Sequence, residues 1–116
     1  MDWGKVIYIF FSLMSLTTTA GFIYDHNQIA LFIAAGVNVI STVLKIGVRN
    51  LLSAELLASS LVADLHLIPA FVALVFYNNI EVAVSLAIGA VVANVFAAVL
   101  ALIESSAEAN KQDDFY

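Results

Sequence analysis

The chain has 116 residues, of which 63% are hydrophobic and 11% are charged, and its formal net charge is −5. So few charges cannot cover the surface of a soluble domain, in which about a quarter of residues are usually charged. The four basic residues, against nine acidic ones, argue against a nucleic-acid-binding surface, and the absence of cysteine excludes disulfides and cysteine-based sites.

Four long apolar segments predict an all-α integral membrane protein. They cover residues 6–24, 29–48, 51–77 and 80–103. Each has roughly the 20 residues that an α-helix needs to cross a bilayer. Because the connections are short, we expect consecutive helices to be antiparallel, which gives an up-down-up-down bundle as a single transmembrane domain over residues 1–104. The polar residues 105–116 predict a mobile cytoplasmic tail.

The basic residues predict the orientation of this bundle. Lys5 precedes the first segment, Lys45 and Arg49 flank the connection between the second and third, and Lys111 is in the tail. All four fall on one membrane face, which predicts that both termini are cytoplasmic. The absence of organellar targeting features favours a prokaryotic inner membrane. We expect Lys45 and Arg49 to reach the cytoplasmic interface, or else to pair with Glu55 across the short connection.

The first two segments each carry polar residues near mid-membrane depth. Segment 6–24 has several hydroxyl side chains, among them Ser15, and segment 29–48 has Asn38 near its midpoint. Asn38 begins a stripe at helical spacing that continues with Thr42 and Lys45. Such residues either join helices by hydrogen bonds or line a polar path through the bundle.

The third segment is the most informative, because Asp64 and His66 lie near its middle. A charged side chain at that depth costs at least about 2.5–3.5 kcal/mol, so it persists only when it is paired, hydrated or neutralised. At 100° per residue, Glu55 and Ser59 share a stripe with His66, whereas Ser60 shares the opposite stripe with Asp64. We therefore expect this helix to lie between its own bundle and a neighbouring subunit or aqueous path.

Pro69 follows His66 by three residues and removes the backbone N–H that would bond the carbonyl of Leu65. A kink beside Asp64 and His66 is expected. The freed carbonyl could help to hold a cation or a proton relay, or it could be satisfied by neighbouring helices, as in many membrane helices without a ligand.

The fourth segment has Asn94 near its midpoint and a track of small residues spaced four apart. Such a track allows another helix to approach closely, within the chain or from a second copy. The track consists of Ser85, Gly89, Ala93, Ala97 and Ala101. A bundle of four helices leaves little room for an internal pore, so transport is expected to require a homo-oligomer.

No recognised catalytic, metal-binding or cofactor-binding motif is present in the sequence. We therefore expect no catalytic residues, no bound metal and no cofactor, and we do not expect an enzyme. The partners that the sequence indicates are the lipid bilayer, further copies of the chain, and a small cation or a proton.

The stretch 38–69 resembles a family of small uncharacterised bacterial inner-membrane proteins, most clearly in residues 45–52, KIGVRNLL, and 64–69, DLHLIP. This resemblance implies a membrane location and no particular activity. The length and the number of spans are also similar to those of small multidrug transporters. Those proteins carry a glutamate in the first helix, whereas the first helix here has no acidic residue, which argues against that assignment.

Two functional hypotheses follow. The first is a small cation channel or carrier, a homo-oligomer in which Asp64 is the central membrane carboxylate and His66, Glu55, Asn38 and Asn94 line or tune the path. The second is a non-transporting structural or regulatory membrane subunit, in which the same polar residues hold the helices together.

Overall fold

The computed structural model describes residues 3–46 and 53–113, which form four α-helices joined by two short connections. The helices are α1 (Trp3–Asp25), α2 (Gln28–Ile46), α3 (Ser53–Tyr77) and α4 (Ile80–Asp113). Each contains a stretch that is long and apolar enough to cross a membrane. The prediction of an all-α protein with four membrane-compatible helices is confirmed.

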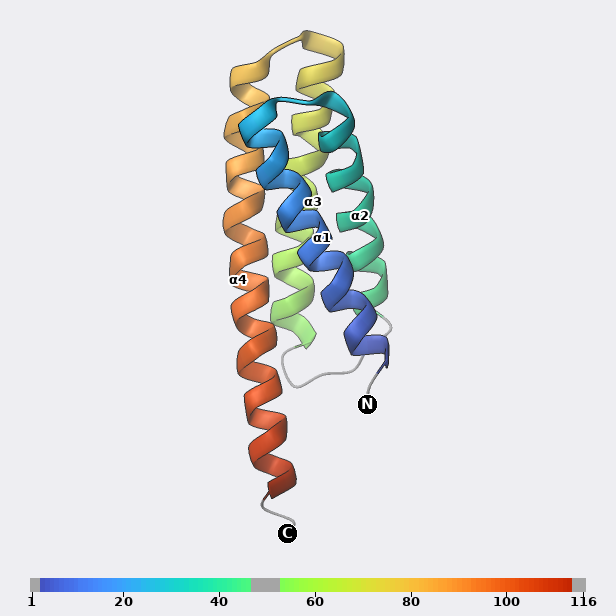
Figure 1. The fold of residues 1–116 in the computed structure, drawn as a ribbon, viewed down its shortest axis with the longest axis vertical. Helices are drawn as coiled ribbons and strands as arrows, with labels where there is room; N and C mark the ends of the chain where they lie inside the picture. Colours follow the sequence, from blue (N-terminus) through green and yellow to red (C-terminus); the bar gives the residue numbers. More distant parts are fainter. Residues whose placement is uncertain (1–2, 47–52, 114–116) are drawn as a thin grey trace.

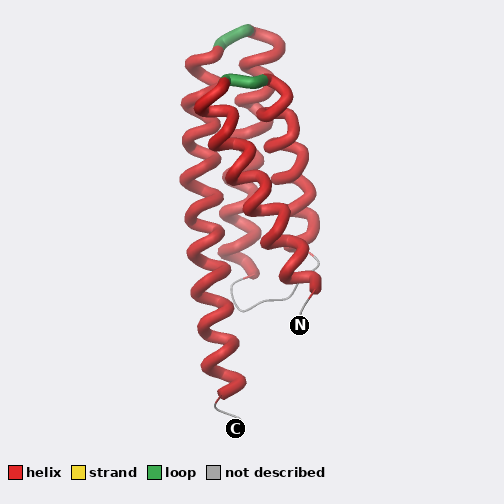
Figure 2. The backbone as a smooth tube through the Cα atoms, viewed as in Figure 1, coloured by secondary structure: helices red, strands yellow, loops and turns green. Residues whose placement is uncertain are grey.

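The helices form an elongated bundle with extents of 57 × 20 × 20 Å. α1 packs against α2 and α4, and α3 packs against the same two helices, so the four make a closed ring. Figures 1 and 2 show the connections 26–27 and 78–79 at one end, called the loop end below, and both termini toward the other, called the terminal end.

The two short connections use the same local chemistry. His26 and Asn78 have positive φ angles of 56° and 50°, a left-handed conformation that ends the preceding helix. Asn27 and Asn79 come next and cap the following helices. The side-chain Oδ1 of Asn27 accepts from the backbone N–H of Ile29 at 2.9 Å, and that of Asn79 accepts from Val82 at 3.1 Å. These polar pairs therefore position α2 and α4 relative to the helices before them.

The interior of the bundle differs between its two ends. The loop-end half is filled by a cluster of apolar side chains from all four helices: Phe22, Leu31, Ala34, Ala63, Leu67, Ala70, Leu74, Ala83, Ala87, Ala90 and Ala93. Buried polar side chains gather at mid-depth and toward the terminal end. In the described part of the chain, Thr19 is the one buried polar residue on the loop-end side, and its hydroxyl donates to Ser15 O of its own helix at 2.6 Å.

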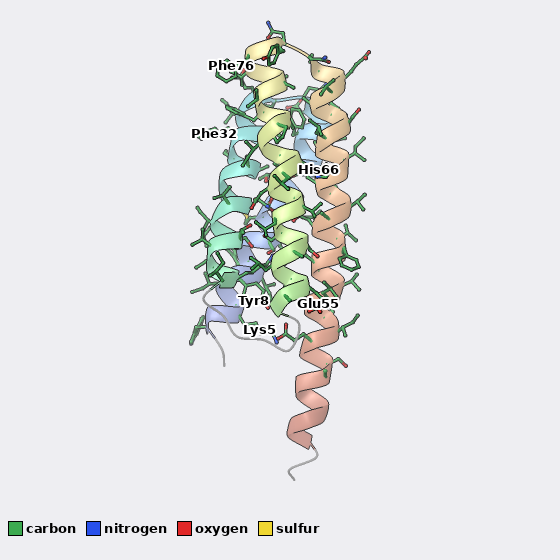
Figure 3. The ribbon with its side chains drawn as sticks, turned by 180° about the vertical axis from the view of Figure 1, so that it is seen from behind. Lys5, Tyr8, Phe32, Glu55, His66 and Phe76 are labelled. Carbon is green, nitrogen blue, oxygen red and sulfur yellow. The ribbon has the colours of Figure 1, made fainter. Side chains whose placement is uncertain are left out.

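The outer surface of the bundle is mostly apolar. Phe32 and Phe76 lie on the outside in Figure 3 and are 61% and 72% exposed. Many other large apolar side chains of all four helices are similarly exposed. A bundle that is apolar on both its core and its outer face matches a lipid environment rather than water.

Two features of the long helices bear on the sequence predictions. α4 continues beyond residue 103 to Asp113, so most of the segment 105–116 is helical, and its mobility and its cytoplasmic location stay predictions. Its alanine, glutamate and lysine residues are good helix formers that can extend a helix already begun. α3 remains α-helical through Pro69, and the kink expected there stays a prediction. Arg49 and the rest of 47–52 lie outside the described residues.

Candidate functional site

The carboxylate of Asp64 lies inside the bundle at the middle of α3, where it faces α2. Asp64 is 8% exposed, and both of its oxygens accept a hydrogen bond from α2. Asn38 Nδ2 donates to Oδ1 at 2.5 Å, and Thr42 Oγ1 donates to Oδ2 at 2.6 Å. The two donors are one helical turn apart on α2, so a single face of that helix binds both carboxylate oxygens.

Ser60, one turn before Asp64 on α3, completes this group. The hydroxyl oxygens of Ser60 and Thr42 are 2.6 Å apart. Because Thr42 donates its single hydroxyl proton to the carboxylate, Ser60 is the donor in this second hydrogen bond. Asn38 Nδ2 also donates to the backbone carbonyl of Ser60 at 3.3 Å. We call Asn38, Thr42, Ser60 and Asp64 the central network. Its donors and acceptors are paired with one another, so it joins α2 to α3.

Lys45 continues the same face of α2 one turn beyond Thr42, and its position differs from the sequence expectation. It is 6% exposed, so its side chain turns into the bundle instead of reaching the interface. Its ammonium lies 5.9 Å from the centroid of the Tyr8 ring, a cation–π distance, and is close enough to Asp64 for the two charges to attract. The stripe of Asn38, Thr42 and Lys45 held the signal for this placement, because the three residues share one helix face, but the sequence prediction sent Lys45 to the interface instead.

A second group of polar contacts joins α1 to α2. The hydroxyls of Ser12 and Ser41 are 2.7 Å apart, and Ser41 Oγ is 3.3 Å from the carbonyl of Tyr8. Ser15 Oγ donates to the carbonyl of Ala34 at 3.2 Å. Short polar side chains thus hold α1 against α2 at several depths, as expected for interhelical hydrogen bonds in a membrane.

Asn94 lies apart from the central network, on α4 facing α1. Its Nδ2 is 3.5 Å from Ser15 Oγ, and its Oδ1 is buried without a hydrogen-bond partner. Asn94 lines a cavity of about 180 Å³ between α1 and α4, the α1–α4 cavity, on the terminal-end side of the bundle. Lys45 lines the same cavity from α2. Sequence reasoning did not foresee this cavity.

His66 and Glu55 lie on the other side of α3, along its junction with α4 (Figure 3). They line an outward-facing groove, the α3–α4 groove, together with Ala58, Ser59, Val62, Gly89, Val92, Ala93 and Phe96. His66 Nδ1 is 2.7 Å from the carbonyl of Val62 in its own helix. The His66 ring rests on Gly89, where an added Cβ would lie 2.8 Å from Nε2, so glycine is needed for this contact.

The five residues proposed from sequence for an ion path therefore occupy three places. Asp64 and Asn38 are joined in the central network, Asn94 faces the α1–α4 cavity, and His66 and Glu55 face the α3–α4 groove. The small-residue track of α4 is divided in the same way. Gly89 and Ala93 line the groove, Ala97 and Ala101 line the cavity, and Ser85 is exposed near the loop end.

Among the side chains that the structure describes, His, Asp and Glu form no group of three or more that could hold a metal ion. The carboxylate of Asp64 is occupied by neutral donors of α2, and the imidazole of His66 lies on the opposite side of α3.

The chain belongs to a family of unknown function, DUF6394, whose model matches residues 25–105. This match bears out the resemblance to a small family without an assigned activity. Comparison with curated proteins and with solved structures gave no match.

Proposed function

We propose that this protein is a non-transporting membrane subunit, structural or regulatory, whose central network holds α2 and α3 in a fixed register. The observation that carries the proposal is that both oxygens of the Asp64 carboxylate already accept hydrogen bonds from α2. Its two oxygens are taken by Asn38 and Thr42, and both donors come from the same chain. A buried carboxylate satisfied in this way specifies how two helices pair, because any rotation or slip would leave charged or polar atoms unpaired in the membrane.

The apolar core beyond this network supports the same proposal. From Asp64 to the loop end at Tyr77 is about 20 Å along α3 at 1.5 Å per residue. Over that length the interior consists of the apolar cluster that includes Leu67, Leu74 and Ala87. In the described part of the chain the one buried polar side chain of this layer is Thr19, whose hydroxyl is bonded to its own helix, so an ion moving through a single bundle would cross the layer at a large desolvation cost.

The α3–α4 groove is the surface through which we expect copies of the chain to assemble. Glu55 is exposed and His66 half-buried, and both belong to a helix that is apolar enough to span a membrane. Polar side chains on a membrane helix rarely face lipid. Small residues such as Ala58 and Gly89 keep the groove open to the approach of another helix. A homo-oligomer would cover these polar groups.

We further propose that the helices cross the membrane up-down-up-down, with the terminal end in the cytoplasm of a prokaryotic cell. Lys5 and Lys45 lie in the terminal-end half of the bundle, whereas the connections at the loop end contain no lysine or arginine. This asymmetry supports a cytoplasmic terminal end.

Cation translocation remains the second candidate function, and one observation favours it. His66 and Glu55 face the groove, so an oligomer could in principle enclose a path between copies. Such a path would be lined by those residues and not by Asp64, which is turned toward α2. The two candidates therefore differ in which substitution affects flux.

The test uses the purified protein in liposomes, with assays for Na⁺, K⁺ and proton flux. We expect no flux above that of empty liposomes, and we expect Asp64→Asn to lower the free energy of unfolding without changing permeability. His66→Ala serves as the matched variant on the opposite face of α3. Cation flux that is lost in His66→Ala would support the second candidate, and flux lost in a folded Asp64→Asn protein would overturn our assignment of Asp64.

A further inference from the structure

The α1–α4 cavity is a space that the protein's own side chains leave open. It lies between α1 and α4 and is closed from behind by Lys45 of α2 and Leu56 of α3. On α4 its wall consists of Ala97, Ala98 and Ala101, whose small side chains do not fill it. Because protein interiors are close-packed, an open space of about 180 Å³ indicates an occupant from outside the chain.

The polar residues around this space turn their hydrogen-bonding groups elsewhere. The hydroxyl of Ser12 is 2.7 Å from that of Ser41, and the ammonium of Lys45 lies over the Tyr8 ring. The unpaired Oδ1 atom of Asn94 is itself buried, so it is not accessible from the cavity. The accessible wall is almost wholly apolar. Apolar cavities stay dry, and a polar ligand would lose its hydrogen bonds to water there, so the wall favours a hydrocarbon.

The cavity opens on the outer face of the bundle. Leu13 of α1 and Leu102 of α4 line it and are 48% and 71% exposed, so its mouth lies between these two helices. Phe10 and Val99, one turn away along the same helices, are also exposed and apolar. Both helices contain a stretch that is long and apolar enough to cross a membrane. In a bilayer, the molecules that reach this mouth are the hydrocarbon chains of lipids.

The position of the cavity along α1 identifies the leaflet. Tyr8 and Leu16 are the first and last residues of α1 that line it, and they lie about 8 and 20 Å from Trp3 at 1.5 Å per residue. Trp3 is exposed at the start of α1, a position typical of an aromatic side chain at the membrane interface. Half of the hydrocarbon core is about 15 Å thick. The cavity therefore lies at the depth of the acyl chains of the terminal-end leaflet, beyond the headgroups.

The size of the cavity excludes a helix of a second copy. An apolar cavity of about 150 Å³ takes up benzene, so about 180 Å³ admits a slender chain. An α-helix with its side chains is about 10 Å wide, which is too wide to enter.

We propose that the α1–α4 cavity holds one hydrocarbon chain of a lipid from the terminal-end leaflet. The chain fills the space beside Ala97, Ala98 and Ala101 and packs α1 against α4. The headgroup stays outside the cavity and is not recognised by the protein. The proposal rests on the membrane placement proposed above and is independent of the central network and of the α3–α4 groove.

The test measures the binding of single-chain lipids to the whole protein by native mass spectrometry. The protein is freed of lipid in a bile-salt-derived detergent, whose rigid fused rings are wider than a hydrocarbon chain. The probes are palmitoyl lysophosphatidylcholine and palmitoyl lysophosphatidylglycerol, which have the same chain and different headgroups. We expect one saturable site for each, with affinities equal to within about twofold. A difference above about fivefold, the effect of one net hydrogen bond, would show headgroup recognition and overturn the proposal.

Two variants carry the same added side chain at different places. Ala98→Phe fills the cavity, whereas Ala20→Phe adds a ring to the exposed face of α1 away from it. Ala98→Phe should weaken binding of both probes by more than about tenfold, because filling a void of this size is worth more than a decade in affinity. Ala20→Phe should bind both probes as the unmodified protein does.

Three results would overturn the proposal or its premise. Unchanged binding in a folded Ala98→Phe protein would place the chain elsewhere, and a lipid-free dimer that Ala98→Phe dissociates would place a side chain of a second copy in the cavity. High-pH extraction of native membranes separates the two levels of failure. Release of the protein would refute the membrane placement, whereas retained protein without saturable lipid binding would refute the lipid site alone. The two probes on the unmodified protein test the proposal even where a variant does not fold.

Discussion

The pairing of Asp64 with Lys45 can be measured by a double-mutant cycle. Asp64→Asn keeps the shape of the side chain but removes its charge, which leaves the buried ammonium of Lys45 without its counter-charge. We expect this change to lower the free energy of unfolding by about 2–4 kcal/mol, because a buried ion that loses its partner is strongly destabilising. Lys45→Met should cost less, because Asp64 keeps its hydrogen bonds from Asn38 and Thr42.

The size of the coupling follows from the geometry of α2. Lys45 is three residues past Thr42, a rise of about 4.5 Å along the helix, and Thr42 contacts the carboxylate directly. At an effective dielectric constant of about 20, two unit charges attract by about 4 kcal/mol at a separation of about 4 Å and by about half of that at twice the separation, so we expect a coupling on the order of 2 kcal/mol. The double variant should therefore lose about 2 kcal/mol less free energy of unfolding than the sum of the losses in the two single variants.

The assay is reversible unfolding of the purified protein in mixed detergent micelles, followed by circular dichroism. Thr17→Val is the control, because the Thr17 hydroxyl is exposed and bonds the backbone of its own helix at Leu13. It should leave stability nearly unchanged. If the effects of Asp64→Asn and Lys45→Met add to within about 0.5 kcal/mol, the two charges are not coupled and the reasoning fails.

Three other predictions concern packing and caps, each checked by thermal unfolding in detergent. Gly89→Val should destabilise the bundle by about 1–3 kcal/mol through its clash with the His66 ring, and adding His66→Ala should relieve most of that loss; no relief would show that the contact is unimportant. Asn79→Ala should cost about 1 kcal/mol because it removes the cap on Val82 N–H, and an unchanged protein would contradict the capping role. Phe22→Ala, at a fully buried site, should cost about 3–5 kcal/mol, and a loss below about 1 kcal/mol would mean that the loop-end core is loosely packed.

The sequence was sufficient to predict the helices, and it pointed to the polar residues of the central network without predicting how they pair. Length and hydropathy identified four membrane-compatible helices, because crossing a bilayer requires long apolar segments whatever the details of packing. Asn38 and Thr42 lie on one face of α2, and Ser60 and Asp64 lie on one face of α3. Once α2 and α3 are neighbours with these faces opposed, the four side chains can form hydrogen bonds.

The rotation of each helix about its axis could not be predicted, and it decides where the other polar residues lie. His66 is two residues from Asp64 and so points to a different face of α3, toward the groove. Asn94 lies beside Ser15 and faces α1. Lys45 turns inward toward the Tyr8 ring of α1 and the charge of Asp64 on α3. Such choices depend on packing among all four helices.

Whether water reaches the loop-end core can be measured directly with introduced cysteines, because the chain has no natural cysteine. Single cysteines at Ala63 and Ala87, both fully buried in the apolar cluster, would be treated in native membranes with a small, charged, water-soluble thiol reagent. His26→Cys in the exposed connection is the positive control. We predict that the control reacts rapidly and that both core cysteines react only after denaturation. Reaction of Ala87→Cys at a rate near that of the control would show an aqueous path through the bundle and would contradict a closed, non-transporting subunit.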